Sequence, residues 1–149
     1  MKKFFVFILF VTLTGSACAL STTDAVENKI LRHIDSQEAE AVMLLQKAVN
    51  INSGTMNFAG VKKVGGLFIN ELNSLGFETS WVDGGEFKRA GHLFGKRGDK
   101  GLKILLIGHL DTVFAKESHF QSYGELPGNK LKGPGTTDMK GGDVIIIYI

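Results

Sequence analysis

Apolar residues recur at helical spacing in two stretches of the first half of the chain. The first stretch runs from Ser36 to Val49, and its apolar positions include Ala39, Val42, Met43, Leu45 and Val49. The second places Val61, Val64, Phe68, Leu72 and Leu75 at similar intervals. Because residues three or four apart share one face of a helix, the pattern predicts two amphipathic helices. Asn50–Gly54 between them is typical of a turn, and Gly76 is expected to cap the second helix.

Three runs typical of strands follow these helices. They are Glu78–Val82, His92–Lys96 and Lys103–Gly108, and glycine-containing turn sequences separate them. The third run contains Ile104-Leu105-Leu106-Ile107, which is apolar on both faces. Since a strand of that kind is usually covered on both sides, we predict that it lies at the centre of a sheet. Two helices followed by such strands favour an α/β architecture.

The rest of the chain divides into a long loop and an apolar final segment. From Phe114 to Thr137 no strong periodicity is present, and Leu126-Pro127-Gly128 is typical of a turn. We therefore predict a surface loop, and loops of this length in compact domains are usually functional. The segment Val144–Ile149 is strongly apolar, which together with an exposed sheet edge predicts a tendency to aggregate.

The first 19 residues have the order of regions found in a secretory signal peptide. Lys2 and Lys3 precede the apolar run Phe4–Leu13, and small residues follow, ending in Ala17-Cys18-Ala19. The run is too short to span a bilayer, so we predict cleavage after Ala19 and a periplasmic or secreted protein. Lipoprotein processing at Cys18 is the alternative, although Gly15 stands where such sites usually carry Leu.

Composition and charge narrow the classes of partner. The chain has 149 residues, of which 44% are hydrophobic and 21% charged, and this predicts a single globular domain over residues 20–149. Loss of Lys2 and Lys3 with the leader would leave 15 basic side chains against 15 acidic ones, which argues against nucleic acid or anionic lipid as a partner. Cys18 is the only cysteine, so any metal bound after cleavage must be held by His, Asp and Glu.

The motif Gly108-His109-Leu110-Asp111-Thr112-Val113 follows the apolar strand directly. In open α/β sheets, ligands bind outside the carboxyl ends of strands. Residues two apart in an extended backbone point to the same side, so Asp111 could accept one ring N–H of His109 while the other nitrogen faces a metal. A hydrogen-bonded surface histidine is the alternative interpretation of so short a motif.

A second motif, Gly133-Pro134-Gly135-Thr136-Thr137-Asp138-Met139-Lys140-Gly141-Gly142, places Asp138 between glycines that permit close approach of the backbone. A carboxylate there could bridge two cations, or it could cap the helix that follows. Phosphate binding is disfavoured, because Lys140 precedes its glycines instead of following one as in a P-loop. Asp138 also stands where a dinucleotide fingerprint requires its third glycine.

Together, the strand followed by GHLDTV and the loop GPGTTDMKGG resemble the zinc exopeptidase family of glutamate carboxypeptidase, aminoacylase, acetylornithine deacetylase and succinyl-diaminopimelate desuccinylase. The resemblance extends through the preceding helices and strands, and the glutamate carboxypeptidase branch looks nearest. It implies that residues 20–149 are the amino-terminal part of a metallopeptidase catalytic domain, with helices packed on a mixed β-sheet. The later strands and the lid or dimerisation domain of that family are not expected here.

The resemblance also implies roles for individual residues. His109 matches the first metal ligand, Asp111 the carboxylate that orients this histidine and supports the catalytic residue, and Asp138 the aspartate that bridges two zinc ions. The peptide bond after this aspartate is commonly cis in the family. The implied reaction is zinc-dependent hydrolysis of an amide bond next to a free carboxylate, in a small peptide or an N-acyl amino acid. Cobalt or manganese could replace zinc, and the complete family protein is expected to be a homodimer.

The chain departs from the family pattern at its end. The general-base glutamate and the remaining ligands correspond to positions after Ile149. His109 and Asp138 supply two ligands, whereas catalytic zinc usually has three from the protein. We therefore expect this chain alone to be inactive and to bind zinc weakly. The alternative is a non-catalytic truncated remnant that acts at most as a binding module.

Other residues that could carry chemistry have simpler interpretations. No carboxylate lies at a recognisable ligand spacing from three further histidines, His33, His92 and His119, which are expected at the surface or in packing. Trp81 is expected in the core. Glu117 and Glu125 lie in the predicted loop and fall in no matching motif.

Overall fold

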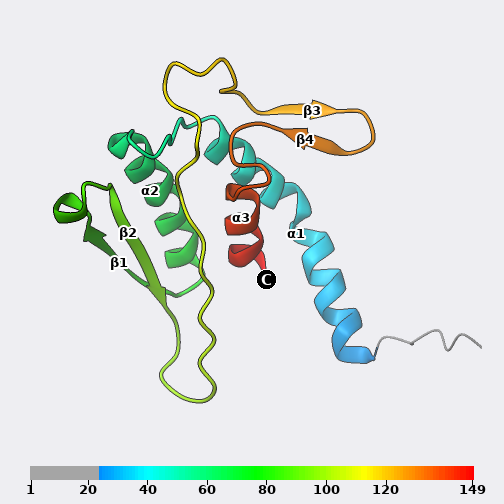
Figure 1. Cartoon of the computed structure of the whole chain (residues 1–149). Coiled ribbons are helices and arrows are strands. Elements are labelled where there is room, and N and C mark those ends of the chain that lie inside the picture. The colour runs from blue at the N-terminus through cyan, green and yellow to red at the C-terminus, as the bar shows by residue number, and fades with distance from the viewer. Residues whose placement is uncertain (1–23) are drawn as a thin grey trace, which may run out of the picture.

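The computed structural model describes residues 24–149, which form three α-helices and two separate two-stranded sheets (Figure 1). The helices are α1 (Ala25–Val49), α2 (Phe58–Ser74) and α3 (Lys140–Tyr148). The strands are β1 (Glu78–Asp83), β2 (Gly91–Lys96), β3 (Gly124–Leu126) and β4 (Lys130–Lys132), and the 3₁₀ turn η1 (Gly85–Phe87) connects β1 to β2. The predicted signal peptide and Cys18 lie outside the described residues. Within those residues, every helix is too short or too polar to cross a membrane.

Helix α1 begins at Ala25, well before the predicted start near Ser36. The Asp24 side chain accepts the backbone N–H groups of Val26 and Glu27 at 2.8 and 2.9 Å, and the Glu27 carboxylate accepts the N–H of Asp24 at 3.3 Å. This capping box supplies acceptors to the first turn, whose N–H groups have no partner within the helix. The start of α1 is therefore set by its cap, and periodicity predicts only the half that packs against the core.

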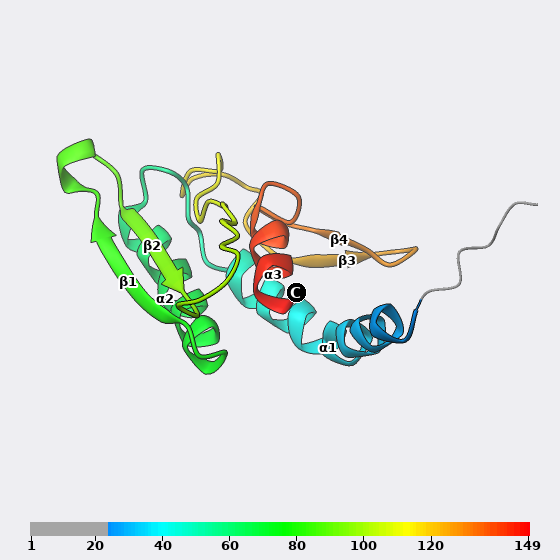
Figure 2. The same cartoon turned by 90° about the horizontal axis from the view of Figure 1, so that it is seen from below.

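The core lies where the second half of α1, α2 and α3 meet. Its buried residues are Leu44, Leu45, Ala48, Val49, Val64, Phe68, Val144 and Ile147. Helices α1 and α3 lie side by side in both views of the ribbon (Figures 1 and 2). Helix α2 ends before Gly76, whose φ of +80° confirms the predicted glycine cap. The apolar final segment is thus a helix that buries one face against α1.

Strands β1 and β2 confirm two of the three predicted strands. They form an antiparallel hairpin in which Trp81 is opposite Leu93, and the hairpin packs against α2 (Figure 2). The α/β class is therefore correct. The mixed sheet is wrong, because both sheets are antiparallel pairs and no strand of the described chain joins them.

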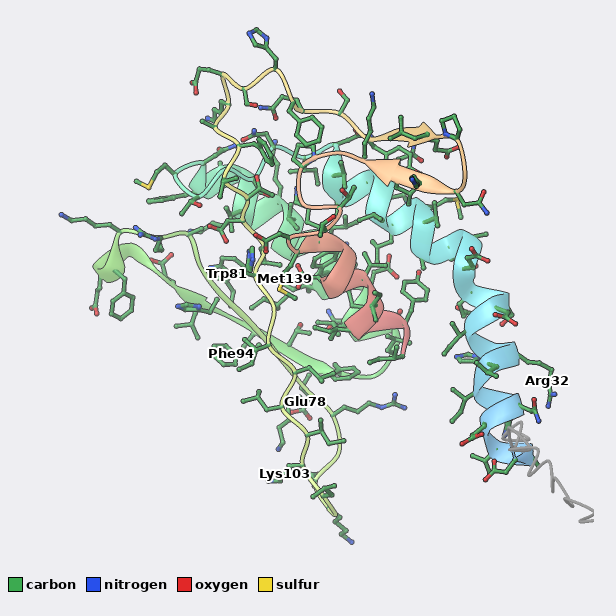
Figure 3. The ribbon with its side chains drawn as sticks, turned by 45° about the vertical axis from the view of Figure 1, so that its right-hand side comes forward. Arg32, Glu78, Trp81, Phe94, Lys103 and Met139 are labelled. Atoms are coloured by element: carbon green, nitrogen blue, oxygen red, sulfur yellow. The ribbon has the colours of Figure 1, made fainter. Side chains whose placement is uncertain are left out.

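The predicted central strand Lys103–Gly108 is also wrong. This segment forms no ladder and runs between β2 and α3 as an extended chain (Figures 1 and 2). Ile104 and Leu105 are 77% and 79% exposed. A central strand needs a hydrogen-bonding neighbour on each side and an apolar layer on each face. Within residues 24–149 this segment has neither. Figure 3 shows Lys103 on this segment, away from Trp81 and from Met139 at the start of α3.

The predicted loop from Phe114 to Thr137 contains the short hairpin of β3 and β4. Gly124 pairs with Lys132 and Leu126 with Lys130, so that Leu126-Pro127-Gly128 begins the expected turn. Strands of three residues are too short for an alternating pattern to be visible in the sequence. The N–H of Tyr123 donates to the Asn50 side chain at 3.0 Å, which attaches the base of this hairpin to the end of α1.

Candidate metal site

The segment that carries His109 is held by the turn between α1 and α2. The N–H of Thr112 donates to the Ser53 carbonyl at 2.8 Å, and the N–H of Thr55 donates to the Thr112 carbonyl at 3.0 Å. Gly54 and Thr112 form an isolated parallel bridge. Since Ser53 and Thr112 are both buried, this connection is shielded from water. The motif is therefore positioned by backbone pairing with a turn that lies far earlier in the chain.

The segment that carries Asp138 is fixed by Lys140. This side chain is fully buried, and its Nζ donates to the carbonyls of Ala48 and Ile51 at 2.8 and 2.9 Å. Burial lowers the pKa of Lys140 to about 8, and the nearby charge of Asp143 acts in the opposite direction. These bonds attach the start of α3 to the end of α1 and so place Asp138, two residues before Lys140. The Asp138–Met139 peptide bond is cis, as the resemblance implies.

His109, Asp111 and Asp138 converge in space. The Nε2 atom of His109 lies 2.8 Å from Oδ1 of Asp138. The Nδ1 atom lies 3.0 Å from the main-chain carbonyl oxygen of Asp111 and 3.2 Å from its carboxylate Oδ1. The expected pairing of His109 with Asp111 is thus present, although the carbonyl shares it with the carboxylate. The imidazole is held between two acidic residues, one on each side of the ring.

The electrostatics of His109 follow from these contacts. Partial burial by itself lowers the pKa of the imidazole. Hydrogen bonds with Asp138 and with the Asp111 backbone, together with the charges of both carboxylates, outweigh burial and raise the pKa above its ordinary value. Because carboxylate and carbonyl oxygens accept hydrogen bonds, these contacts favour the protonated form of the imidazole relative to a free histidine.

The distance between His109 and Asp138 tests whether they could hold zinc. Tetrahedral zinc with bonds of about 2.1 Å keeps two ligand atoms about 3.4 Å apart. The observed 2.8 Å between Nε2 and Oδ1 would have to open by about 0.6 Å. The Asp138 side chain is 79% exposed and can make that adjustment. The two residues fit as ligands of one ion, but residues 24–149 contain no group of three or more His, Cys, Asp or Glu side chains placed to hold a metal.

Two residues near the site do not stand out in the sequence. Thr55 donates its hydroxyl to Oδ2 of Asp111 at 2.5 Å. Asp143, in the first turn of α3, is 6% exposed, and its Oδ2 has no hydrogen-bond partner among the described residues. A Cβ added at Gly108 would overlap Asp143 Oδ1, so the absence of a side chain at Gly108 permits the close approach of α3. Neither position has a local pattern that indicates its environment.

The remaining residues lie apart from this cluster. His33 and His119 are exposed, and His92 is an exposed residue of β2 whose ring is tilted against that of Phe94. Trp81 is half-buried on β1, and a Cβ added at Gly65 of α2 would overlap its ring. Glu117 and Glu125 lie in the 114–137 segment, where Glu125 accepts the Tyr123 hydroxyl at 3.2 Å. A cavity of about 470 Å³ is lined by α2, β2, the extended segment and α3, and its lining includes His109 and Asp111 of the site.

Comparison with known proteins relates the chain to a carboxypeptidase. No family model matches the chain. The chain is 28% identical over 142 residues to carboxypeptidase G2 of Pseudomonas sp. (strain RS-16). The alignment covers 95% of this chain and 34% of that protein, so the chain spans about a third of the length of its relative. This protein is therefore a distant homologue of carboxypeptidase G2, in agreement with the resemblance carried by its two motifs.

Proposed function

We propose that this chain carries part of the metal site of a zinc-dependent hydrolase of the carboxypeptidase or amidohydrolase type. His109 and Asp138 would be the metal ligands, and Asp111 would position His109. The observation that carries the proposal is the convergence of His109 Nε2 and Asp138 Oδ1, at 2.8 Å, from segments 29 residues apart. Similarity to carboxypeptidase G2 over 95% of the chain supports it independently.

The residues of the chain would prepare His109 for a cation. The Asp111 carbonyl accepts the Nδ1–H, which fixes the ring orientation and leaves Nε2 directed at Asp138. Zinc bound there would supply Lewis-acid polarisation of the amide carbonyl and activation of a water molecule. Cobalt or manganese could serve in its place, since nitrogen and oxygen ligands accept all three metals. The reaction we propose is hydrolysis of an amide bond next to a free carboxylate, with a small peptide or N-acyl amino acid as substrate.

Two direct ligands are fewer than the three that catalytic zinc usually takes from a protein. We therefore expect residues 24–149 to bind zinc weakly and to be inactive without further ligands. The second candidate function is a non-catalytic binding module, since the described residues contain no third ligating side chain. We also propose that the amino-terminal leader directs the chain to the periplasm or to the medium.

Zinc titration by calorimetry tests the assignment. The purified chain is titrated with a zinc salt, alongside His109→Ala and Asp138→Ala. Each substitution removes one of the two direct ligands. Loss of an outer-shell partner typically lowers metal affinity by about 10- to 100-fold, so loss of a direct ligand should lower the zinc affinity by at least about tenfold. His119→Ala is the matched control, because His119 is an exposed histidine outside the cluster. Its affinity for zinc should equal that of the parent chain.

The result also separates the two candidate functions. A parent chain that binds no zinc, or variants that bind as tightly as the parent, would refute the ligand assignment. Zinc binding that depends on both ligands without hydrolysis of N-acyl amino acids would agree with the incomplete site. Hydrolysis abolished by His109→Ala would show that further ligands are available, contrary to our expectation for this chain.

A further inference from the structure

The carboxylate of Asp111 is held from two sides. Its Oδ1 lies 3.2 Å from His109 Nδ1, and its Oδ2 accepts the hydroxyl of Thr55 at 2.5 Å. Thr55 lies 56 residues earlier, in the turn between α1 and α2. A hydroxyl donating to a carboxylate at this distance is a short, charge-assisted hydrogen bond. The carboxylate is thereby connected to a part of the chain outside the motifs of His109 and Asp138.

The position of Thr55 is itself well determined. Its N–H donates to the Thr112 carbonyl at 3.0 Å, next to the parallel bridge between Gly54 and Thr112. On the other side of the turn, the Asn52 side chain donates to the carbonyl of Phe114 at 3.2 Å and to the side chain of Gln121 at 2.7 Å. These bonds attach the turn to the segment immediately after Asp111. Thr55 is thus presented to Asp111 by backbone and side-chain contacts on both sides.

The geometry favours the carboxylate over the competing acceptor. A threonine hydroxyl has one proton, and the Thr55 oxygen lies 2.5 Å from Asp111 Oδ2 but 3.3 Å from the Thr112 carbonyl. The shorter contact, to a charged acceptor, is the stronger one. With Oδ2 engaged by Thr55, the other carboxylate oxygen, Oδ1, lies 3.2 Å from His109 Nδ1, beside the main-chain carbonyl of Asp111 that accepts the Nδ1–H at 3.0 Å. Thr55 therefore limits the rotation of the Asp111 side chain.

We infer that Thr55 is a positioning residue of the metal site, which acts on His109 through Asp111. This inference rests on the proposed function. Outer-shell partners that orient a ligating histidine typically contribute about 10- to 100-fold to metal affinity. Asp111 is partly exposed, so water can replace part of the lost bond, and we expect Thr55→Val to weaken zinc binding by about tenfold, the lower end of that range.

The test is calorimetric titration of the purified chain with a zinc salt. Thr55→Val removes the hydroxyl and keeps the shape, whereas Thr55→Ser keeps the hydroxyl and should bind within about twofold of the parent chain, since the donor that the outer shell requires is retained. Thr79→Val is the matched control, because Thr79 is a half-buried residue of β1 whose hydroxyl donates to Asn73, outside the cluster. The double variant of Thr55→Val and Asp111→Asn separates a role that Thr55 exerts through Asp111 from a general structural role. If Thr55 acts through Asp111, the valine has little further effect once Asp111 is altered.

The outcomes distinguish this inference from the proposed function. If the parent chain binds no zinc, or His109→Ala binds as the parent does, the metal site itself is refuted, and Thr55 loses its role with it. If His109→Ala weakens binding while Thr55→Val binds like the parent, only the role of Thr55 is refuted. The role of Thr55 would also be refuted if Thr55→Val reduced the zinc affinity by the same factor in the parent chain and in Asp111→Asn. If Thr55→Val does not melt cooperatively, Thr55→Ser decides alone, because binding as weak as that of Asp111→Asn would contradict the inference.

Discussion

Replacing Asp143 with asparagine should stabilise the protein, and more so at neutral pH than in weak acid. Burial raises the pKa of Asp143 from 3.8 to about 7, and the charges of His109 and Lys140 only partly offset that effect. Its Oδ2 has no hydrogen-bond partner among the described residues. A charged carboxylate in this position is therefore unfavourable in the folded state. The asparagine side chain has a similar shape without the charge.

The magnitude and sign follow from proton linkage. The folded protein holds the proton of Asp143 up to a pH of about 7, whereas the unfolded chain releases it near 3.8. Between these values the folded state binds more protons, so this group lowers the stability as pH rises. A shift of this size corresponds to about 4 kcal/mol when both states are fully ionised. From about pH 5 to about pH 7.5 the penalty grows by roughly 2 to 3 kcal/mol.

Urea denaturation of the parent chain and Asp143→Asn at these two pH values measures the effect. The pH-independent cost of placing an amide in the site cancels in the comparison. The advantage of the variant should increase by about 2 to 3 kcal/mol between about pH 5 and about pH 7.5. Asp99→Asn is the control, since Asp99 is an exposed carboxylate paired with Lys96. An advantage that stays constant or shrinks with rising pH would refute the argument that Asp143 is buried without a partner.

Two further predictions concern packing and solubility. Gly108→Ala should lower the free energy of unfolding by about 1–3 kcal/mol, because its Cβ would overlap Asp143 Oδ1. A Cβ added at Gly66 in α2 meets nothing within 4 Å, so Gly66→Ala should raise the free energy of unfolding by about 0.5–1 kcal/mol. Equal effects of the two substitutions in urea denaturation would contradict this pair of predictions. Replacing Leu102 and Ile107, which are 91% and 75% exposed, with Lys should shift the chain toward monomer in size-exclusion chromatography. An unchanged elution profile would show that this segment does not drive association.

Local pattern predicts the elements that depend on local interactions. The periodic apolar residues of α1 and α2, the Gly76 cap and the strands β1 and β2 are all present, because a helix face or a short strand is defined within a few residues. The apolar periodicity does not predict the start of α1, because the capping box of Asp24 and Glu27 determines where the helix begins. His109, Asp111 and Asp138 are also candidates from the sequence, because the two motifs that contain them carry the family resemblance.

The sequence by itself therefore determined two of the three helices, two of the strand segments and the candidate site residues His109, Asp111 and Asp138. The tertiary structure alone decided that Thr55 meets Asp111 and that Lys140 attaches α3 to the end of α1. It also decided that Lys103–Gly108 remains exposed, although its composition is that of a buried strand. The physical reason is common to these cases. Burial and hydrogen bonding between segments depend on partners distant in the chain, and the local sequence pattern does not specify which partner a segment will contact.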